Sequence, residues 1–270
     1  MKGGLRRTYT EWGKNIKGRP EINHSEVKQI YIEGHRGGTF KTPENTMASF
    51  RNAIALSADS VELDVWLTKD KQLAVIHGKD NGEISSSTNG NGIVYNLTYS
   101  ELLNFDAGNG EKIPLLNNVL ELCKDRIFVN IEIKPQPSEE VVYEVTNLIK
   151  KMNYFNNCAI SSFHHPFLEL ANKLTNGMLE IGYLFEYVPE DMNILYQNGN
   201  TINLSFKLIT PEISKKIHES GKGVLVWSWG DEEMDYEKIL QCDPDILCVN
   251  NPQALMYYLL HNGWCIAKSD

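Results

Sequence analysis

The chain has 270 residues, of which 41% are hydrophobic and 23% charged, and its formal net charge is −9. This composition is typical of a soluble globular protein with a sizeable core, so we do not expect a disordered chain. The negative charge also argues against a nucleic-acid-binding protein, because such binding depends on clustered Lys and Arg. The length suits a single α/β barrel, so we expect one large domain over residues 28–270.

The first 27 residues are expected to form a basic extension in front of this domain. Residues 1–20 contain six basic side chains and one acidic side chain, a balance of 6 − 1 = +5. Such an arm can contact an anionic membrane surface, and a solvated tail is the plainer alternative. No stretch approaches the ~20 apolar residues that cross a bilayer, and no secretory signal is present. Five scattered cysteines without a CxxC pair resemble reduced packing residues. We therefore expect a soluble, cytoplasmic protein.

From about residue 28, short β-rich runs alternate with helical patterns, which is typical of parallel strands joined by crossover helices. The predicted strands are residues 28–34, 60–66, 72–77, 127–133, 157–162, 179–184, 201–205, 222–228 and 245–249. The predicted helices are residues 43–57, 98–104, 115–124, 138–151, 165–174, 189–197, 211–219 and 232–240. Nine strands are one more than an eight-stranded barrel needs, which suggests that one of these predictions is spurious.

Two predicted strands, 60–66 and 72–77, are separated by only a short segment centred on residues 68–71. That is hairpin spacing, whereas parallel neighbours need a longer crossover. If both are strands, one of them breaks the regular β/α alternation. The following segment, residues 78–92, is dense in Gly, Asn and Ser, and we interpret it as a mobile loop that sets substrate choice.

Three carboxylates lie on two of these predicted strands. Glu62 and Asp64 share one face of strand 60–66, because side chains alternate with a period of two. Glu132 shares a face of strand 127–133 with Asn130 and Lys134. Each run alone is equally well explained by an amphipathic strand with a wet face. Together, the three carboxylates suit a hard divalent cation, Mg²⁺ or Ca²⁺, both of which prefer oxygen ligands.

Two histidines lie at the ends of predicted strands, where barrel active sites gather. His35 is in the run Gly-His-Arg-Gly-Gly, and His77 ends the run Leu-Ala-Val-Ile-His. A single histidine there is more often structural, but two beside acidic pairs favour acid–base catalysis. Arg36 can bind a phosphate through two parallel hydrogen bonds.

Two further residues have a structural and a functional interpretation. Thr42 and Pro43 predict a helix start with Thr42 as the N-cap. Glu44 either belongs to that helix start alone or reaches back to orient the site. Trp227 and Trp229 share one strand face, which is usual in a core; Trp227 lining the mouth of a pocket is the alternative.

A series of short motifs follows the order found in one known enzyme family. The motifs are His35-Arg36-Gly37, Pro43-Glu44-Asn45-Thr46, Glu62-Leu63-Asp64-Val65, Thr68-x-Asp70, His77, Thr88-Asn89-Gly90, Lys112-Ile113-Pro114-x-Leu116, Asn130-Ile131-Glu132-Ile133-Lys134, Ser161-Ser162-Phe163 and Val226-Trp227-Ser228. Each motif is weak alone, but the ordered set is specific. In these motifs the chain resembles the glycerophosphodiester phosphodiesterase family.

The resemblance implies a distorted (β/α)8 TIM barrel of the PLC-like phosphodiesterase type, with a small glycerophosphodiester as substrate. It also implies the following site: Mg²⁺ or Ca²⁺ held by Glu62, Asp64 and Glu132; acid–base catalysis by His35 and His77; substrate contacts from Arg36, Lys134, Phe163 and Trp227; and an auxiliary role for Glu44.

The chain also departs from the family pattern in three places. Gly78 follows the second histidine where the family usually has Asp, Ser86 and Ser87 lie where an Arg is often found, and Asn250 and Asn251 replace a common Thr-Asp. These changes bear on substrate identity. Two alternatives therefore stay open: a phospholipase D-like activity on lysolipids or sphingolipids, and a barrel that binds glycerophosphodiesters without catalysis.

Overall fold

The structure is a computed structural model that describes residues 30–187, 189, 191, 193–194, 199–228 and 234–264. The basic extension predicted for residues 1–27 lies outside these residues, as does much of the helix predicted for 189–197. Within the described ranges, no helix is both long enough and apolar enough to cross a membrane.

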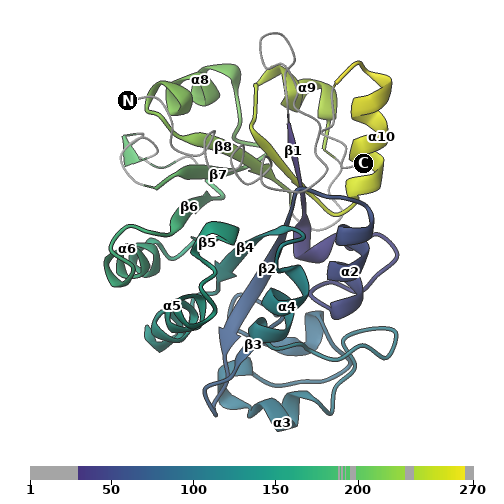
Figure 1. The fold of residues 1–270 in the computed structure, drawn as a ribbon, viewed down its shortest axis with the longest axis vertical. Helices are drawn as coiled ribbons and strands as arrows, with labels where there is room; N and C mark the ends of the chain where they lie inside the picture. The colour runs from purple at the N-terminus through teal and green to yellow at the C-terminus, as the bar shows by residue number, and fades with distance from the viewer. Residues whose placement is uncertain are drawn as a thin grey trace.

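The described strands form one nine-stranded sheet. They are β1 (Tyr31–Gly34), β2 (Ser60–Leu67), β3 (Leu73–Val75), β4 (Phe128–Ile133), β5 (Cys158–Ser162), β6 (Glu180–Phe185), β7 (Thr201–Ser205), β8 (Gly223–Trp227) and β9 (Ile246–Val249). Every neighbouring pair except β2 and β3 is parallel. Because β1 pairs with both β9 and β2, the eight parallel strands close into a barrel (Figure 1). The predicted barrel fold is confirmed.

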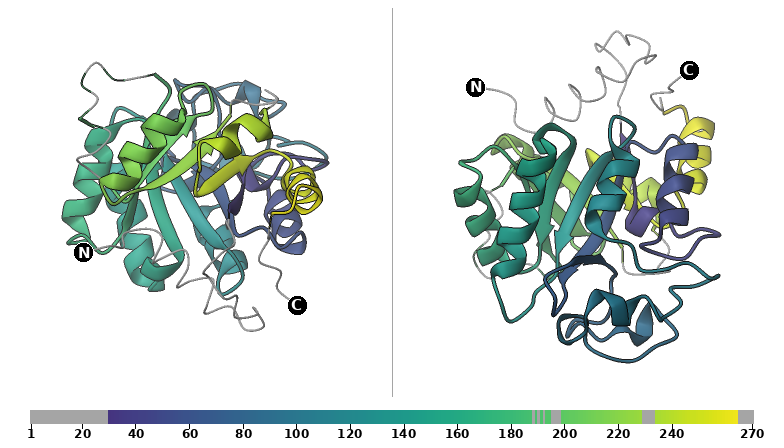
Figure 2. Two further views of the ribbon diagram at one scale, coloured as in Figure 1. Left: turned by 90° about the horizontal axis from the view of Figure 1, so that it is seen from above. Right: turned by 60° about the horizontal axis from the view of Figure 1, so that its bottom comes forward.

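Helices surround this barrel on the outside, as the view from above shows (Figure 2). They are α2 (Met47–Ala55), α4 (Leu116–Cys123), α5 (Glu140–Met152), α6 (His165–Leu174), α8 (Pro211–Glu219), α9 (Tyr236–Gln241) and α10 (Pro252–His261). A further short helix, α3 (Tyr99–Leu102), lies below the barrel at the bottom of Figure 1. The main core lies between strands and helices. On β2, for example, Val61, Leu63 and Val65 have no exposed surface and belong to that core. Their neighbours Glu62 and Asp64 consequently face the barrel interior.

The ninth strand belongs to an insertion rather than to the barrel. β3 pairs antiparallel with β2 through Val65 and Val75, which is the hairpin that the short spacing indicated. It opens an insertion (residues 68–115) that lies at the bottom of Figure 1 and packs around a separate core. Buried members of that core are Trp66, Ala74, Ile76, Ile84, Val94, Leu102 and Ile113. The suggestion that one predicted strand is spurious was therefore wrong.

Two helix predictions also need correction. Thr42 is not an N-cap: α2 begins at Met47, and the cap is Thr46, which forms a reciprocal capping box with Ser49. The chain cannot be helical earlier, because Asn45 has a left-handed backbone with φ of 54°. α10 has no counterpart among the predicted helices, although Asn251 caps it and Pro252 begins it.

Candidate active site

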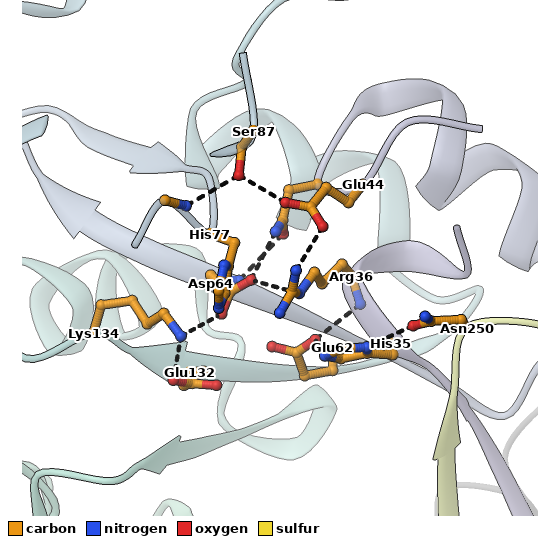
Figure 3. Close-up of polar contacts among 12 residues, drawn as sticks. His35, Arg36, Glu44, Glu62, Asp64, His77, Ser87, Glu132, Lys134 and Asn250 are labelled. Carbon is orange, nitrogen blue, oxygen red and sulfur yellow. Dashed lines mark hydrogen bonds and ion pairs between the residues drawn. The ribbon is translucent and has the colours of Figure 1, made fainter. Parts of the chain in front are cut away.

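The strand ends of the barrel line a pocket that opens to solvent. Its lining residues are Glu33, His35, Arg36, Glu62, His77, Asn130, Glu132, Lys134, Ser161, Phe163, Leu184, Asn203, Leu225, Trp227 and Cys248. The barrel thus brings together at one pocket most of the residues that the sequence singled out. Asp64 and Glu44 do not line it, but each contacts residues that do (Figure 3).

The three predicted carboxylates form one buried cluster. Glu62, Asp64 and Glu132 are at most 7% exposed, and one oxygen from each lies within 4.8 Å of the others. Burial, together with the charges of the other two carboxylates, raises the pKa of Glu62. Glu62 Oε1 is buried and makes no hydrogen bond in the described structure. A hard divalent cation fits this donor set, because it prefers carboxylate oxygens and offsets their mutual repulsion.

Lys134 joins two members of the cluster. Its Nζ lies 3.0 Å from Asp64 Oδ1 and 2.7 Å from Glu132 Oε1. Although burial opposes ionisation of Asp64, this ammonium holds the pKa of the Asp64 carboxyl well below its usual range. Asn45 fixes the same carboxylate from the other side, because its Nδ2 donates to Asp64 Oδ2 at 2.7 Å. Asp64 is therefore a charged, oriented group next to the pocket.

Arg36 turns back on the cluster through an unusual backbone conformation. Its φ of 50° lies in the left-handed region, which a residue with a Cβ adopts at some cost. In that conformation its backbone N donates to Glu62 Oε2 at 2.8 Å, and its Nε lies 3.6 Å from Asp64 Oδ2. The next residue must be Gly37, because a Cβ there would lie 2.3 Å from Ser49 Oγ.

Glu44 connects Arg36 to the insertion. The carboxylate accepts a hydrogen bond of 2.6 Å from the Arg36 guanidinium and one of 2.7 Å from Ser87 Oγ. Ser87 Oγ in turn accepts from the backbone N of Gly78 at 3.1 Å. Glu44 thus lies outside the helix and reaches the site, as the second interpretation of this residue required. Residues 78–92, whose proposed mobility stays a prediction, reach the site through Ser87.

The two histidines approach the cluster from different elements. His35 follows β1, and its Nδ1 lies 2.6 Å from Asn250 Oδ1 while its Nε2 lies 3.9 Å from Glu62 Oε2. His77 follows β3, and its carbonyl accepts a hydrogen bond from Trp66 Nε1. Burial, followed by the charge of Arg36, lowers the pKa of His35 to about 3. Burial also lowers the pKa of His77 to about 3, against the opposing effect of Asp64. Burial therefore disfavours the protonated form of both imidazoles.

An aromatic pair forms another part of the lining. The rings of Phe163 and Trp227 meet edge to face, with centroids 5.5 Å apart and an interplanar angle of 85°. Trp227 is 5% exposed and donates from Nε1 to the carbonyl of Asn203 at 3.1 Å. It is thus a buried residue that also lines the pocket. Trp229, which the sequence places on the same strand face, lies outside the described residues.

Sequence reasoning missed or undervalued several residues of the site. Glu33 was not singled out, although a charged residue at even spacing before His35 on an apolar strand is a usable signal. Asn203 carried no signal of its own. Asn250 was noted only as a departure from a family pattern, and its contact with His35 spans 215 residues of chain.

The fold and the site define a barrel enzyme whose pocket pairs two histidines with an acidic, metal-type cluster. The family described as Glycerophosphoryl diester phosphodiesterase matches residues 35–254. The chain belongs to this family and is a phosphoric diester hydrolase.

Named relatives agree with this assignment. A glycerophosphodiester phosphodiesterase of Caldanaerobacter subterraneus subsp. tengcongensis is 34% identical over 253 residues, which cover 88% of this chain and 100% of the relative. Lysophospholipase D GDPD1 of Homo sapiens is 31% identical over 150 residues, or 50% of this chain and 46% of the relative. The structure of an Oleispira antarctica phosphodiesterase in complex with the product sn-glycerol-3-phosphate shares the fold, with a TM-score of 0.74 and 22% identity over 85% of this chain and 96% of that chain.

Proposed function

We propose that the protein hydrolyses glycerophosphodiesters to glycerol phosphate and an alcohol, with a divalent cation and two histidines at its active site. The observation that carries the proposal is that His35, His77 and Arg36 line one pocket together with two members of the carboxylate cluster, Glu62 and Glu132. The name of the Caldanaerobacter relative and the product bound to the Oleispira enzyme support the same substrate class.

Glu62, Asp64 and Glu132 would hold the cation, Mg²⁺ or Ca²⁺. When bound, it supplies positive charge that stabilises the developing charge on the phosphate oxygens. Arg36 and Lys134 line the same pocket and add two further positive charges. Both are anchored by carboxylates, Arg36 by Glu44 and Lys134 by Glu132. The two carboxylates hold the positively charged side chains of Arg36 and Lys134 in place before substrate arrives. The reaction then requires less reorganisation of these side chains.

His35 is the group best placed to accept a proton. With Asn250 Oδ1 accepting from Nδ1–H, the unprotonated Nε2 faces the pocket and Glu62. It removes the proton from the attacking hydroxyl, which is water or the hydroxyl of the substrate's own glycerol. In the second case the alcohol leaves as a cyclic phosphate forms, and water later opens that ring to give glycerol phosphate. His77 gives a proton to the oxygen of the leaving alcohol. The negative phosphate of a bound substrate raises the affinity of His77 for that proton.

Replacing Asn250 by alanine is expected to lower kcat about tenfold or more, because His35 then loses the acceptor that fixes its ring and tautomer. KM should change little, since Asn250 is not among the residues that line the pocket. Asn250→Asp keeps an acceptor at the same place and should restore most of the rate. Steady-state kinetics at saturating cation measure both parameters.

The neighbouring asparagine provides the control for this prediction. Asn251 caps α10 by accepting from the backbone N of Ala254, and it makes no contact with His35. Asn251→Ala should therefore lower stability and leave kcat near the wild-type value. Equal kcat losses in the two alanine variants would show that Asn250 acts only on the fold.

A substrate panel tests the proposed function directly. The relative that is similar over its whole length is named a glycerophosphodiester phosphodiesterase, which favours a glycerophosphodiester over a lysolipid. We expect turnover of glycerophosphocholine to exceed that of lysophosphatidylcholine. The reverse preference would support the phospholipase D-like alternative, which agrees with the name of the human relative, a lysophospholipase D. Binding without any turnover would instead indicate a barrel that has lost catalysis.

A further inference from the structure

Part of the pocket lining is polar but has no role in the proposed mechanism. Glu33 on β1 lines the pocket and has no exposed surface. Its two carboxyl oxygens accept hydrogen bonds from Ser60 Oγ at 3.0 Å and Asn130 Nδ2 at 3.2 Å. Asn130 in turn accepts from Ser161 Oγ at 2.9 Å. Strands β2, β4 and β5 therefore fix the orientation of a buried carboxyl that has no ion pair with a described Lys or Arg.

Asn203 on β7 contributes a second acceptor to the same pocket. The residue is 1% exposed, and within the described ranges its Oδ1 has no hydrogen-bond partner. Gly182 on the neighbouring strand leaves room for this amide, because a Cβ there would lie 2.7 Å from Asn203 Nδ2. A buried acceptor without a donor is unfavourable, so a donor supplied by a ligand would stabilise the site.

Glu33 and Asn203 decide which part of a ligand can occupy the pocket beside them. A phosphate is attracted to Arg36 and Lys134 on the same pocket, and its charged oxygens cannot donate a hydrogen bond to Asn203 Oδ1. A group that reaches Glu33 and Asn203 must instead donate hydrogen bonds. Burial raises the pKa of Glu33, which favours a neutral donor over a cation.

We infer that Glu33 and Asn203 bind the hydroxyl groups of the substrate's glycerol and thereby select glycerol esters from other phosphodiesters. This inference rests on the proposed function, because it assigns the two ends of one ligand to one pocket. Leu184 and Leu225, which also line the pocket, would contact the carbon chain between the hydroxyls.

Calorimetric titration of the cation-loaded full chain tests the inference with three monophosphates. They are sn-glycerol 3-phosphate, n-propyl phosphate, which lacks the hydroxyls, and phosphoethanolamine, which carries an ammonium. The wild type should bind sn-glycerol 3-phosphate about tenfold or more tightly than n-propyl phosphate, as expected for two hydrogen bonds. Glu33→Leu and Asn203→Leu should each reduce this ratio toward one, while the affinity for n-propyl phosphate stays unchanged.

Thr201→Val is the matched control, because Thr201 is buried on the same strand as Asn203 and does not line the pocket. It should keep the wild-type ratio. A ratio that persists in both leucine variants would overturn the inference, as would tighter binding of phosphoethanolamine than of sn-glycerol 3-phosphate. Turnover assays separate this result from the proposed function: a wild type that keeps the ratio without hydrolysing glycerophosphodiesters supports the hydroxyl site and contradicts only the hydrolysis.

Discussion

Replacing His35 or His77 by alanine is expected to lower kcat by about 100-fold or more, because each removes one proton-transfer group from the pocket. Metal binding should be nearly unchanged, since the cation cluster consists of carboxylates alone. Steady-state kinetics with glycerophosphocholine and the metal content of each variant measure the two effects. The double variant should lose far less than the product of the single losses, because groups that act together lose their benefit together.

His218 offers a control for the histidine variants. It pairs with Asp245 at 2.8 Å and does not line the active-site pocket. His218→Ala should therefore keep kcat close to the wild-type value. If His35→Ala or His77→Ala bound metal normally and also kept a wild-type kcat, that histidine would be structural, and the acid–base roles would have to be reassigned.

Removal of the divalent cation is expected to lower activity by about 100-fold or more, and Mg²⁺ or Ca²⁺ should restore it. The physical reason is that Glu62, Asp64 and Glu132 are buried together and repel one another without it. The same cation should raise the melting temperature in a concentration-dependent way, because it binds the folded chain. Dialysis against a chelator followed by assay and thermal denaturation measures both effects.

Conservative variants show whether the carboxylates bind the cation that activates and stabilises the protein. Glu62→Gln and Glu132→Gln should weaken cation binding and lower the thermal shift, whereas Glu140→Gln on α5 should leave both unchanged because Glu140 lies outside the pocket. Full turnover by protein whose metal content is verified as zero would remove the basis for a cation-dependent mechanism.

The barrel was predictable because its signals are local. Short β-rich runs located every strand, and the side-chain period of two placed Glu62 and Asp64 on one face of β2. The start of α2 was not predictable from Thr42 and Pro43, because Asn45 is used instead to hold Asp64 and adopts a left-handed backbone. Local propensity was overridden there by a tertiary contact.

The site was predictable where a residue with a suitable side chain also lies on or at the end of a predicted strand, as for the carboxylates and the two histidines. It was not predictable where a residue's partner is remote in sequence. Asn250 contacts His35 only because β9 and β1 are neighbours in the closed sheet. Glu33 and Asn203 share a pocket only because β1 and β7 belong to one barrel. These contacts arise because barrel closure brings strands together that are remote in sequence, so no short stretch of sequence predicts them.

The insertion gives the two histidines different supports. His35 is attached to the barrel, whereas His77 follows β3 and adjoins the separate core of residues 68–115. On the proposed mechanism, activity therefore depends on packing in the insertion as well as in the barrel, although the barrel is closed by β1 and β2 without the insertion. During gradual heating, loss of packing around Ile84 and Leu102 would displace one histidine before the barrel opens. The midpoint temperature of inactivation would then be lower than that of global unfolding. An enzyme assay would report the thermal stability of the insertion (residues 68–115) rather than that of the barrel.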